Sequence, residues 1–371
     1  MCPYKPFFLI VIFLTIVAPR KGLLGAENAR RFLPALPGYD YEFPRDHGSH
    51  PLYQTEWWYY TGHLRTASGK EYGFELTFFR VGVAGDAPPS SNPWELRDVG
   101  LAHFAITDIG RRRFRFHQRL NRLSPYTADA RIGSLHVFNE GWSVSTTSDG
   151  RIRLRAAADG DTIDLIVRSE KPPSVHGKNG ISVKAEGIGY ASHYYSLTRL
   201  TGSGTVGAQG LTENCTVLAW MDHEFGSSSL RENQSGWDWF SAQLDNGTEL
   251  MIYVIRKRDG SPDKTSSGSI VLQDGTVIHL EPSQFTITSQ RRWRSPRSGA
   301  TYPLGWIVEV RPLNVRIELT ERMKEQELIT TSSTGITYWE GAVSVIGSFG
   351  DTPVRGVGYV EMTGYDRPFG R

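Results

Sequence analysis

Short runs of alternating apolar and polar residues dominate the chain. The segments "RIRLRAAADGDTIDLIV" (151–167), "SQFTITS" (283–289) and "VRIELT" (315–320) alternate or are rich in β-branched residues, with Gly, Asp and Asn between the runs. This pattern is typical of half-buried strands joined by tight turns. Strong helical periodicity never extends beyond about two turns, and short helices are expected only at 27–36 and 322–328. The pattern therefore predicts an all-β protein.

The strand pattern is repeated about half the chain further on. The segment "EWWYYTGHL" (56–64) resembles "GWDWFSAQL" (236–244), and the strands that follow, "YGFELTFFR" and "ELMIYVIR", both end on Arg. Four more matches come in the same order: 102–108 with 268–274, Gly141-Trp142 with Gly305-Trp306, 194–204 with 338–348, and 217–224 with 356–363. An ordered series of this kind indicates an internal duplication.

Each copy is long enough for roughly six to nine antiparallel strands, which favours a closed barrel because closure removes exposed strand edges. Since 217–224 matches the last strand of the second copy, the first copy must end after it. We therefore expect an N-terminal barrel over 40–230 and a C-terminal barrel over 231–371, packed side by side.

Residues 1–26 have a different character. Lys5 precedes an apolar run from Phe7 to Ala18, and small residues follow. The run is shorter than the ~20 residues of a membrane span, so it predicts a signal peptide and export to the periplasm or the exterior. Arg20 and Lys21, placed after the run, leave an uncleaved N-terminal anchor as the alternative.

The composition excludes several classes of function. The chain has 41 Lys and Arg against 39 Asp and Glu, so its charge does not indicate a nucleic-acid partner. A hydrophobic content of 39% is sufficient for a real core. Cleavage after residue 26 would leave Cys215 as the one cysteine, without a disulfide. No G-x-S-x-G, phosphate-binding glycine loop or H-E-x-x-H motif occurs, so neither a cofactor nor a metal ion is expected.

Aromatic residues occupy both faces of the first strand of each copy. Alternation places Trp58 and Tyr60 on one face of "EWWYYTGHL" and Trp57 on the other. A strand that is apolar on both faces is covered on both, here by a barrel interior and by the sister domain. The rings either fill solid cores or leave room for one elongated apolar ligand. The predicted ligand-binding residues are Trp57, Trp58, Tyr60, His103, Trp220, Trp237 and Trp239.

Carboxylates stand within two of these apolar strands. In "WMDHEFG", Asp222 and Glu224 share one face, and His223 lies on the other. A carboxylate pair facing a ligand would raise one pKa and create a proton donor; the alternative is a structural ion-pair girdle with Arg80, Arg199 or Arg256. Asp238 replaces Trp58 in the second copy. It is either a buried acid poised to protonate a weak base or a strand-start Asp bonded to a turn or an Arg.

The segment "RRRFRFHQR" (111–119) alternates two phenylalanines with basic residues. It is interpreted as a strand with one solvated basic face.

Eight segments together resemble the AttH-like and carotenoid 1,2-hydratase (hydroxyneurosporene synthase) family: "DHGSHPLYQTEWWYYTGHL", "FELTFFR", "AHFAITD", "ASHYYSLTRL", "AWMDHEFGS", "GWDWFSAQLDNGTELMIYVIR", "YWEGAVSVIG" and "GVGYVEMTGY". The likeness extends from about residue 40 to the C-terminus. It implies two lipocalin-like barrels in an exported bacterial protein, and relatives of this kind are often labelled predicted secreted hydrolases.

The resemblance also implies an apolar partner, a lipid or an isoprenoid. Hydratases of the family add water to a carbon–carbon double bond by acid catalysis, which requires a carboxylic acid near the alkene and aromatic rings beside the developing cation. By this resemblance Asp222, His223, Glu224 and Asp238 are the catalytic candidates. The forms "GWDWF" and "DHEFG" are closer to the secreted branch, so a non-catalytic carrier and a secreted hydrolase remain alternatives to hydration.

Overall fold

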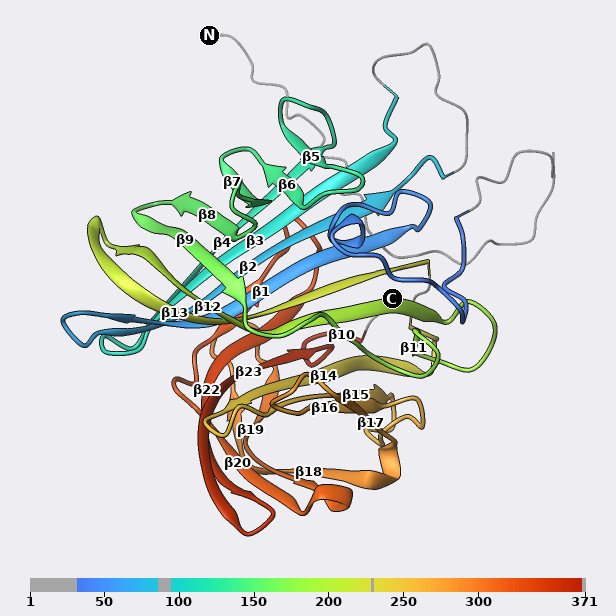
Figure 1. The fold of residues 1–371 in the computed structure, drawn as a ribbon, viewed down its shortest axis with the longest axis vertical. Coiled ribbons are helices and arrows are strands. Elements are labelled where there is room, and N and C mark those ends of the chain that lie inside the picture. The colour runs from blue at the N-terminus through green and yellow to red at the C-terminus, as the bar shows by residue number, and fades with distance from the viewer. Residues whose placement is uncertain (1–31, 86–94, 228–229, 369–371) are drawn as a thin grey trace, which may run out of the picture.

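The computed structural model describes residues 32–85, 95–227 and 230–368, and its strands form two antiparallel sheets (Figure 1). The helical elements among these residues are three 3-10 turns, η1 (Arg45–His47), η2 (Pro282–Gln284) and η3 (Arg311–Leu313). The all-β prediction is confirmed. The helix expected at 322–328 is wrong, because that segment bends into strand β21 (Glu327–Ile329). The described part of 27–36 contains no helix.

The first sheet contains thirteen strands. Eleven lie in one path, in the spatial order β4 (Arg113–Arg122), β3 (Asp98–Asp108), β2 (Glu71–Gly82), β1 (Thr55–Thr66), β13 (Leu211–Gly226), β12 (Ala191–Ala208), β9 (Asp161–Ser169), β8 (Ile152–Ala158), β7 (Trp142–Thr146), β6 (His136–Asn139) and β5 (Ala128–Ala130). The short strands β10 (Ser174–Val175) and β11 (Ser182–Val183) pair with β12.

The second sheet contains ten strands. Its order is β17 (Val277–Leu280), β16 (Ser267–Val271), β15 (Glu249–Lys257), β14 (Gln234–Leu244), β23 (Thr352–Thr363), β22 (Thr337–Phe349), β20 (Val315–Glu321), β19 (Thr301–Val310) and β18 (Phe285–Arg294), with β21 paired to β22.

The two sheets differ in how far they close. In the first, a bridge between Ser124 and Ala128 joins the ends of β4 and β5, and Arg119 Nη1 donates to the carbonyl of Asn139 at 2.7 Å. This sheet is a nearly closed barrel of eleven strands, whereas the second is a curled half-barrel. The predicted tandem of β-barrels is therefore confirmed, with a second member that stays open.

The strand order reproduces the repeat found in the sequence. From β4 to β7, the nine strands of the first sheet correspond position by position to β17 through β18 in the second. Five of the six sequence matches occupy equivalent strands. The match of Trp142 with Trp306 does not, because Trp142 lies on β7 and Trp306 on β19, which is equivalent to β8.

The convex face of the first barrel packs on the convex face of the half-barrel. Strands β1 and β2 contact β23 and β22, respectively, and Figure 1 shows the two sheets stacked along this layer. Alternation sends Trp58 and Tyr60 of β1 into the first core and Tyr59 into the layer between the sheets, beside Trp239 of β14. Both faces of β1 are therefore covered, as the sequence predicted.

The predicted signal peptide, residues 1–26, lies outside the described residues. Among the residues that are described, no helix combines the length and hydropathy needed to cross a bilayer.

Candidate functional site

The predicted site residues fall in three separate places. The faces of β13 divide the "WMDHEFG" motif: Asp222 and Glu224 point into the layer between the sheets, while His223 points into the first barrel beside Trp58. Asp238 lies in the half-barrel, paired with Arg256. These candidates thus do not form one constellation.

The layer between the sheets holds four buried carboxyl groups and one half-buried one, Glu361. We call the five the acid layer: Glu75 of β2, Asp222 and Glu224 of β13, Glu340 of β22 and Glu361 of β23. They meet because Glu340 and Glu361 stand directly opposite each other in the second sheet. Asp222 and Glu75 lie on the facing strands of the first sheet. The raised pKa of Glu340 and Glu361 reflects, after burial, repulsion from Glu75 of the other sheet.

Asp222 accepts hydrogen bonds from three side chains of the first sheet, one of which is bonded in turn to the second sheet. The Tyr194 hydroxyl donates to its Oδ2 at 2.7 Å, the Trp220 indole donates to its Oδ1 at 2.6 Å, and Ser196 donates to the same oxygen. Trp239 of the second sheet donates to the Tyr194 hydroxyl at 3.0 Å. This chain of bonds fixes Asp222 relative to the half-barrel.

Two further tyrosines bridge the sheets. Tyr59 donates to Glu340 Oε1 at 2.7 Å, and Tyr338 donates to Glu75 Oε1 at 3.0 Å. His103 Nδ1 lies 2.7 Å from the Tyr338 hydroxyl, so this histidine supports the layer indirectly. The other oxygens, Glu75 Oε2 and Glu340 Oε2, are buried without a hydrogen-bond partner among the described residues.

Four carboxyl groups of the acid layer have a raised pKa: Glu75, Asp222, Glu340 and Glu361. Burial raises the pKa of Asp222 and of Glu75 to about 7 and that of Glu361 to about 8. Burial, followed by repulsion from Glu75 and Glu361, raises the pKa of Glu340 well above its ordinary value. Since Tyr59 donates to Glu340 Oε1, the oxygen of Glu340 that is free to carry a proton is Oε2.

A second cluster of ionisable side chains lies at the end of the first barrel. His223 Nε2 and His50 Nδ1 lie 2.9 Å and 2.8 Å from Glu56 Oε1, and Arg80 donates to Glu56 Oε2 at 3.1 Å. Burial raises the pKa of Glu56, but the hydrogen bonds from His223 and His50 outweigh it and hold the pKa well below its usual range. Among the described residues, His50, Glu56 and His223 form the set that could hold a metal ion; here their atoms bond one another.

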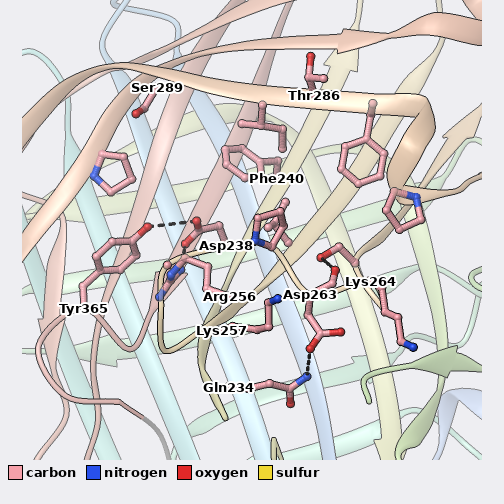
Figure 2. Close-up of a pocket in the computed structure, with 18 of the residues that line it drawn as sticks. Gln234, Asp238, Phe240, Arg256, Lys257, Asp263, Lys264, Thr286, Ser289 and Tyr365 are labelled. Atoms are coloured by element: carbon pink, nitrogen blue, oxygen red, sulfur yellow. Dashed lines mark hydrogen bonds and ion pairs between the residues drawn. The ribbon is translucent and has the colours of Figure 1, made fainter. Parts of the chain in front are cut away.

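The third place is an open cavity of about 1070 Å³ in the half-barrel (Figure 2). Asp238 forms an ion pair with Arg256 and accepts a bond from the Tyr365 hydroxyl at 3.1 Å. Burial raises the pKa of Asp238 to about 6 in spite of Arg256, so this carboxyl is mostly ionised at pH 7. Of the two roles predicted for Asp238, its surroundings therefore match an Asp paired with an Arg better than a buried proton donor.

The predicted tryptophans divide in the same way. Trp220 and Trp239 lie in the acid layer, with Trp57 and Trp237 packed at its margin; Trp58 and Tyr60 fill the first core. Sequence reasoning missed Glu75, Glu340 and Glu361. Each is a single acidic residue inside an otherwise apolar strand, in "FELTFF", "YWEGAV" and "YVEMT", which is the same signal that singled out Asp238.

The model of the AttH-like family matches residues 34–365, so the chain belongs to this family. A putative AttH from Nitrosomonas europaea is 35% identical and has a TM-score of 0.81, with 90% of this chain and 99% of that chain covered. No curated protein sequence matches.

Two more distant structures share the fold. Kievitone hydratase from Nectria haematococca is 16% identical with a TM-score of 0.69, covering 91% of this chain and 99% of that one. CghA, solved with Sch210972, is 13% identical with a TM-score of 0.51, covering 92% and 98%.

Proposed function

We propose that this protein adds water to a carbon–carbon double bond of an apolar, lipid-like or isoprenoid substrate, with the acid layer as the source of the proton. The observation that carries the proposal is Glu340: a buried carboxyl group with a raised pKa, whose Oε2 has no partner among the described residues and which lies among other acids and aromatic rings. A fold shared with kievitone hydratase supports this reaction class.

The reaction begins with proton transfer from Glu340 Oε2 to one alkene carbon, which leaves a cation on the other. The rings of Tyr59, Trp220 and Trp239 lie in the same layer, and aromatic faces stabilise a cation by about 0.5–2 kcal/mol each. Water then attacks the cation, and a carboxylate takes up the proton that this water releases.

Asp222 is the candidate for that base. Its pKa of about 7 leaves it partly ionised at neutral pH, and its bonds to Tyr194 and Trp220 fix its position. The unpartnered oxygen of Glu75 is available to bond a polar group of the substrate.

The experiment compares Glu340→Gln with Glu309→Gln, which makes the same change at an exposed position. Apolar molecules that co-purify are identified by mass spectrometry and incubated with each variant in ¹⁸O-labelled water. Wild type and Glu309→Gln should incorporate label, and Glu340→Gln should be slower by about 100-fold or more, the usual contribution of a general acid. Equal incorporation by Glu340→Gln would contradict the assignment.

A non-catalytic carrier is the second candidate, favoured by the half-barrel cavity. A carrier would return every co-purified molecule unlabelled, in the wild type as in the variants.

A further inference from the structure

The half-barrel cavity is separate from the acid layer. Side chains alternate along β14, so Asp238 and Phe240 face the cavity while Trp237 and Trp239 face the other sheet. Part of its wall is apolar: Phe240, Phe285 and Trp306 are buried, and Val254 and Ile287 are half-buried. Its volume of about 1070 Å³ is large enough for an elongated ligand.

Comparison of the two copies shows what fills the equivalent position in the first barrel. In the first barrel, Trp58 fills the equivalent position with no exposed surface, and its indole donates to the carbonyl of His47 at 3.1 Å. Tyr41 and Phe43 also pack on that core, so the chain before β1 covers this end of the barrel. In the half-barrel the smaller Asp238 replaces Trp58, and the interior stays open.

Charge on the cavity wall indicates what kind of head group it accepts. The lining includes five basic and three acidic residues: Arg231, Arg256, Lys257, Lys264 and Arg292, and Glu186, Asp238 and Asp263. Two of the basic groups are already paired, Arg256 with Asp238 and Lys264 with Glu186. Arg292, exposed on the edge strand β18, forms no ion pair with a described residue.

We propose that this cavity binds a long-chain carboxylate, with the hydrocarbon chain against Phe240, Trp306 and Ile287 and the carboxylate at Arg292. A guanidinium presents two parallel N–H donors that match the two oxygens of a carboxylate. The ion pair of Asp238 with Arg256 lies at one side of the cavity (Figure 2) and neutralises that wall. This site is independent of the proposed hydration.

Calorimetric titration tests the site with oleate and with oleyl alcohol, which has the same chain without the anion, both below their aggregation limits. One oleate should bind per chain, and oleyl alcohol should bind more weakly. Ile287→Trp should weaken the binding of oleate at least tenfold, because the larger side chain fills the cavity. Arg292→Ala should weaken the binding of oleate by about fivefold, the contribution of one exposed ion pair. It should leave the affinity for oleyl alcohol unchanged.

Arg294→Ala is the matched control, because Arg294 lies on the same strand, is exposed and does not line the cavity. It should bind oleate as the wild type does. Equal effects of Arg292→Ala and Arg294→Ala, or equal affinities for acid and alcohol, would overturn the carboxylate assignment. If Ile287→Trp binds oleate as tightly as the wild type does, the ligand does not lie in the half-barrel cavity. Loss of oleate binding in Glu340→Gln would likewise overturn this location. Melting temperatures of all variants establish that each is folded.

Discussion

Two buried tyrosines of the first barrel differ in what their hydroxyl groups contact. The Tyr195 hydroxyl lies 2.7 Å from His47 Nδ1 and 3.0 Å from His223 Nδ1. The Tyr60 hydroxyl has no hydrogen-bond partner among the described residues, although the side chain is fully buried. A buried hydroxyl without a partner costs stability, whereas a bonded one contributes to it.

Tyr60→Phe should therefore leave the free energy of unfolding unchanged or raise it by about 1 kcal/mol, because the change removes an unpaired polar atom. Tyr195→Phe should lower it by about 1–3 kcal/mol, since His47 and His223 lose a partner. Urea unfolding of both variants measures the difference. Equal destabilisation of the two would mean that the Tyr60 hydroxyl is bonded in solution.

At the scale of elements, strand β4 is placed differently from the sequence prediction. The basic side of 111–119 is not a solvated face: Arg115 Nε donates to the buried Asp161 at 2.5 Å, and His117 Nε2 lies 3.1 Å from the same carboxylate. Phe114 and Phe116, on the opposite side, pack against the second sheet near Leu328. The alternation was predicted, and the partners of each face were not.

Strand β2 shows how closely the two sheets approach. A Cβ added at Gly73 would lie 2.4 Å from the Tyr359 hydroxyl and 3.0 Å from the Ala342 Cβ, both on the second sheet. The absence of a side chain at this position therefore permits the contact that assembles the acid layer.

Gly73→Ala should lower the free energy of unfolding by about 1–3 kcal/mol, because Tyr359 must move to admit the methyl group. Gly141→Ala is the control: a Cβ there meets nothing within 4 Å, and its effect should stay within about 0.5 kcal/mol. Urea unfolding compares the two. If Gly73→Ala behaves like Gly141→Ala, the sheets are less closely packed in solution than they are here.

At the scale of the whole molecule, two groups of carboxyls give opposite pH dependences. Glu56, in the first barrel, has a pKa held well below its usual range, so its contribution to stability is lost as the pH falls. Glu361, in the acid layer, has a folded pKa of about 8 against an ordinary 4.5. The native state therefore keeps a proton that the unfolded chain releases, and stability falls as the pH rises between these values.

From about pH 7 to pH 8, above the titration of the histidines in the unfolded chain, the free energy of unfolding should fall by up to about 1.4 kcal/mol per pH unit for each such carboxyl. Glu361→Gln should make this dependence shallower, since the amide does not titrate, and Glu309→Gln should leave it unchanged. Urea unfolding at a series of pH values measures the slope. A wild-type stability that rises over this range would show that the acid layer is ionised in the native state.

The site could be predicted only in part. The sequence supplied Asp222, Glu224, Trp220, Trp237 and Trp239, all of which lie in or beside the acid layer. It grouped them with His223 and Asp238, which point to other compartments. Residues on one strand are near in sequence whichever face they occupy, so proximity in sequence could not separate them.

The sequence by itself determined the all-β class, the duplication and the burial of both faces of β1, because alternation and repetition are local properties of the chain. Only the tertiary structure decided that the two convex faces meet and bring Glu75 and Glu340 into one layer. It also decided that the second sheet stays open around Asp238. Those outcomes depend on contacts between strands far apart in sequence, and a period-two pattern is the same whichever partner covers each face.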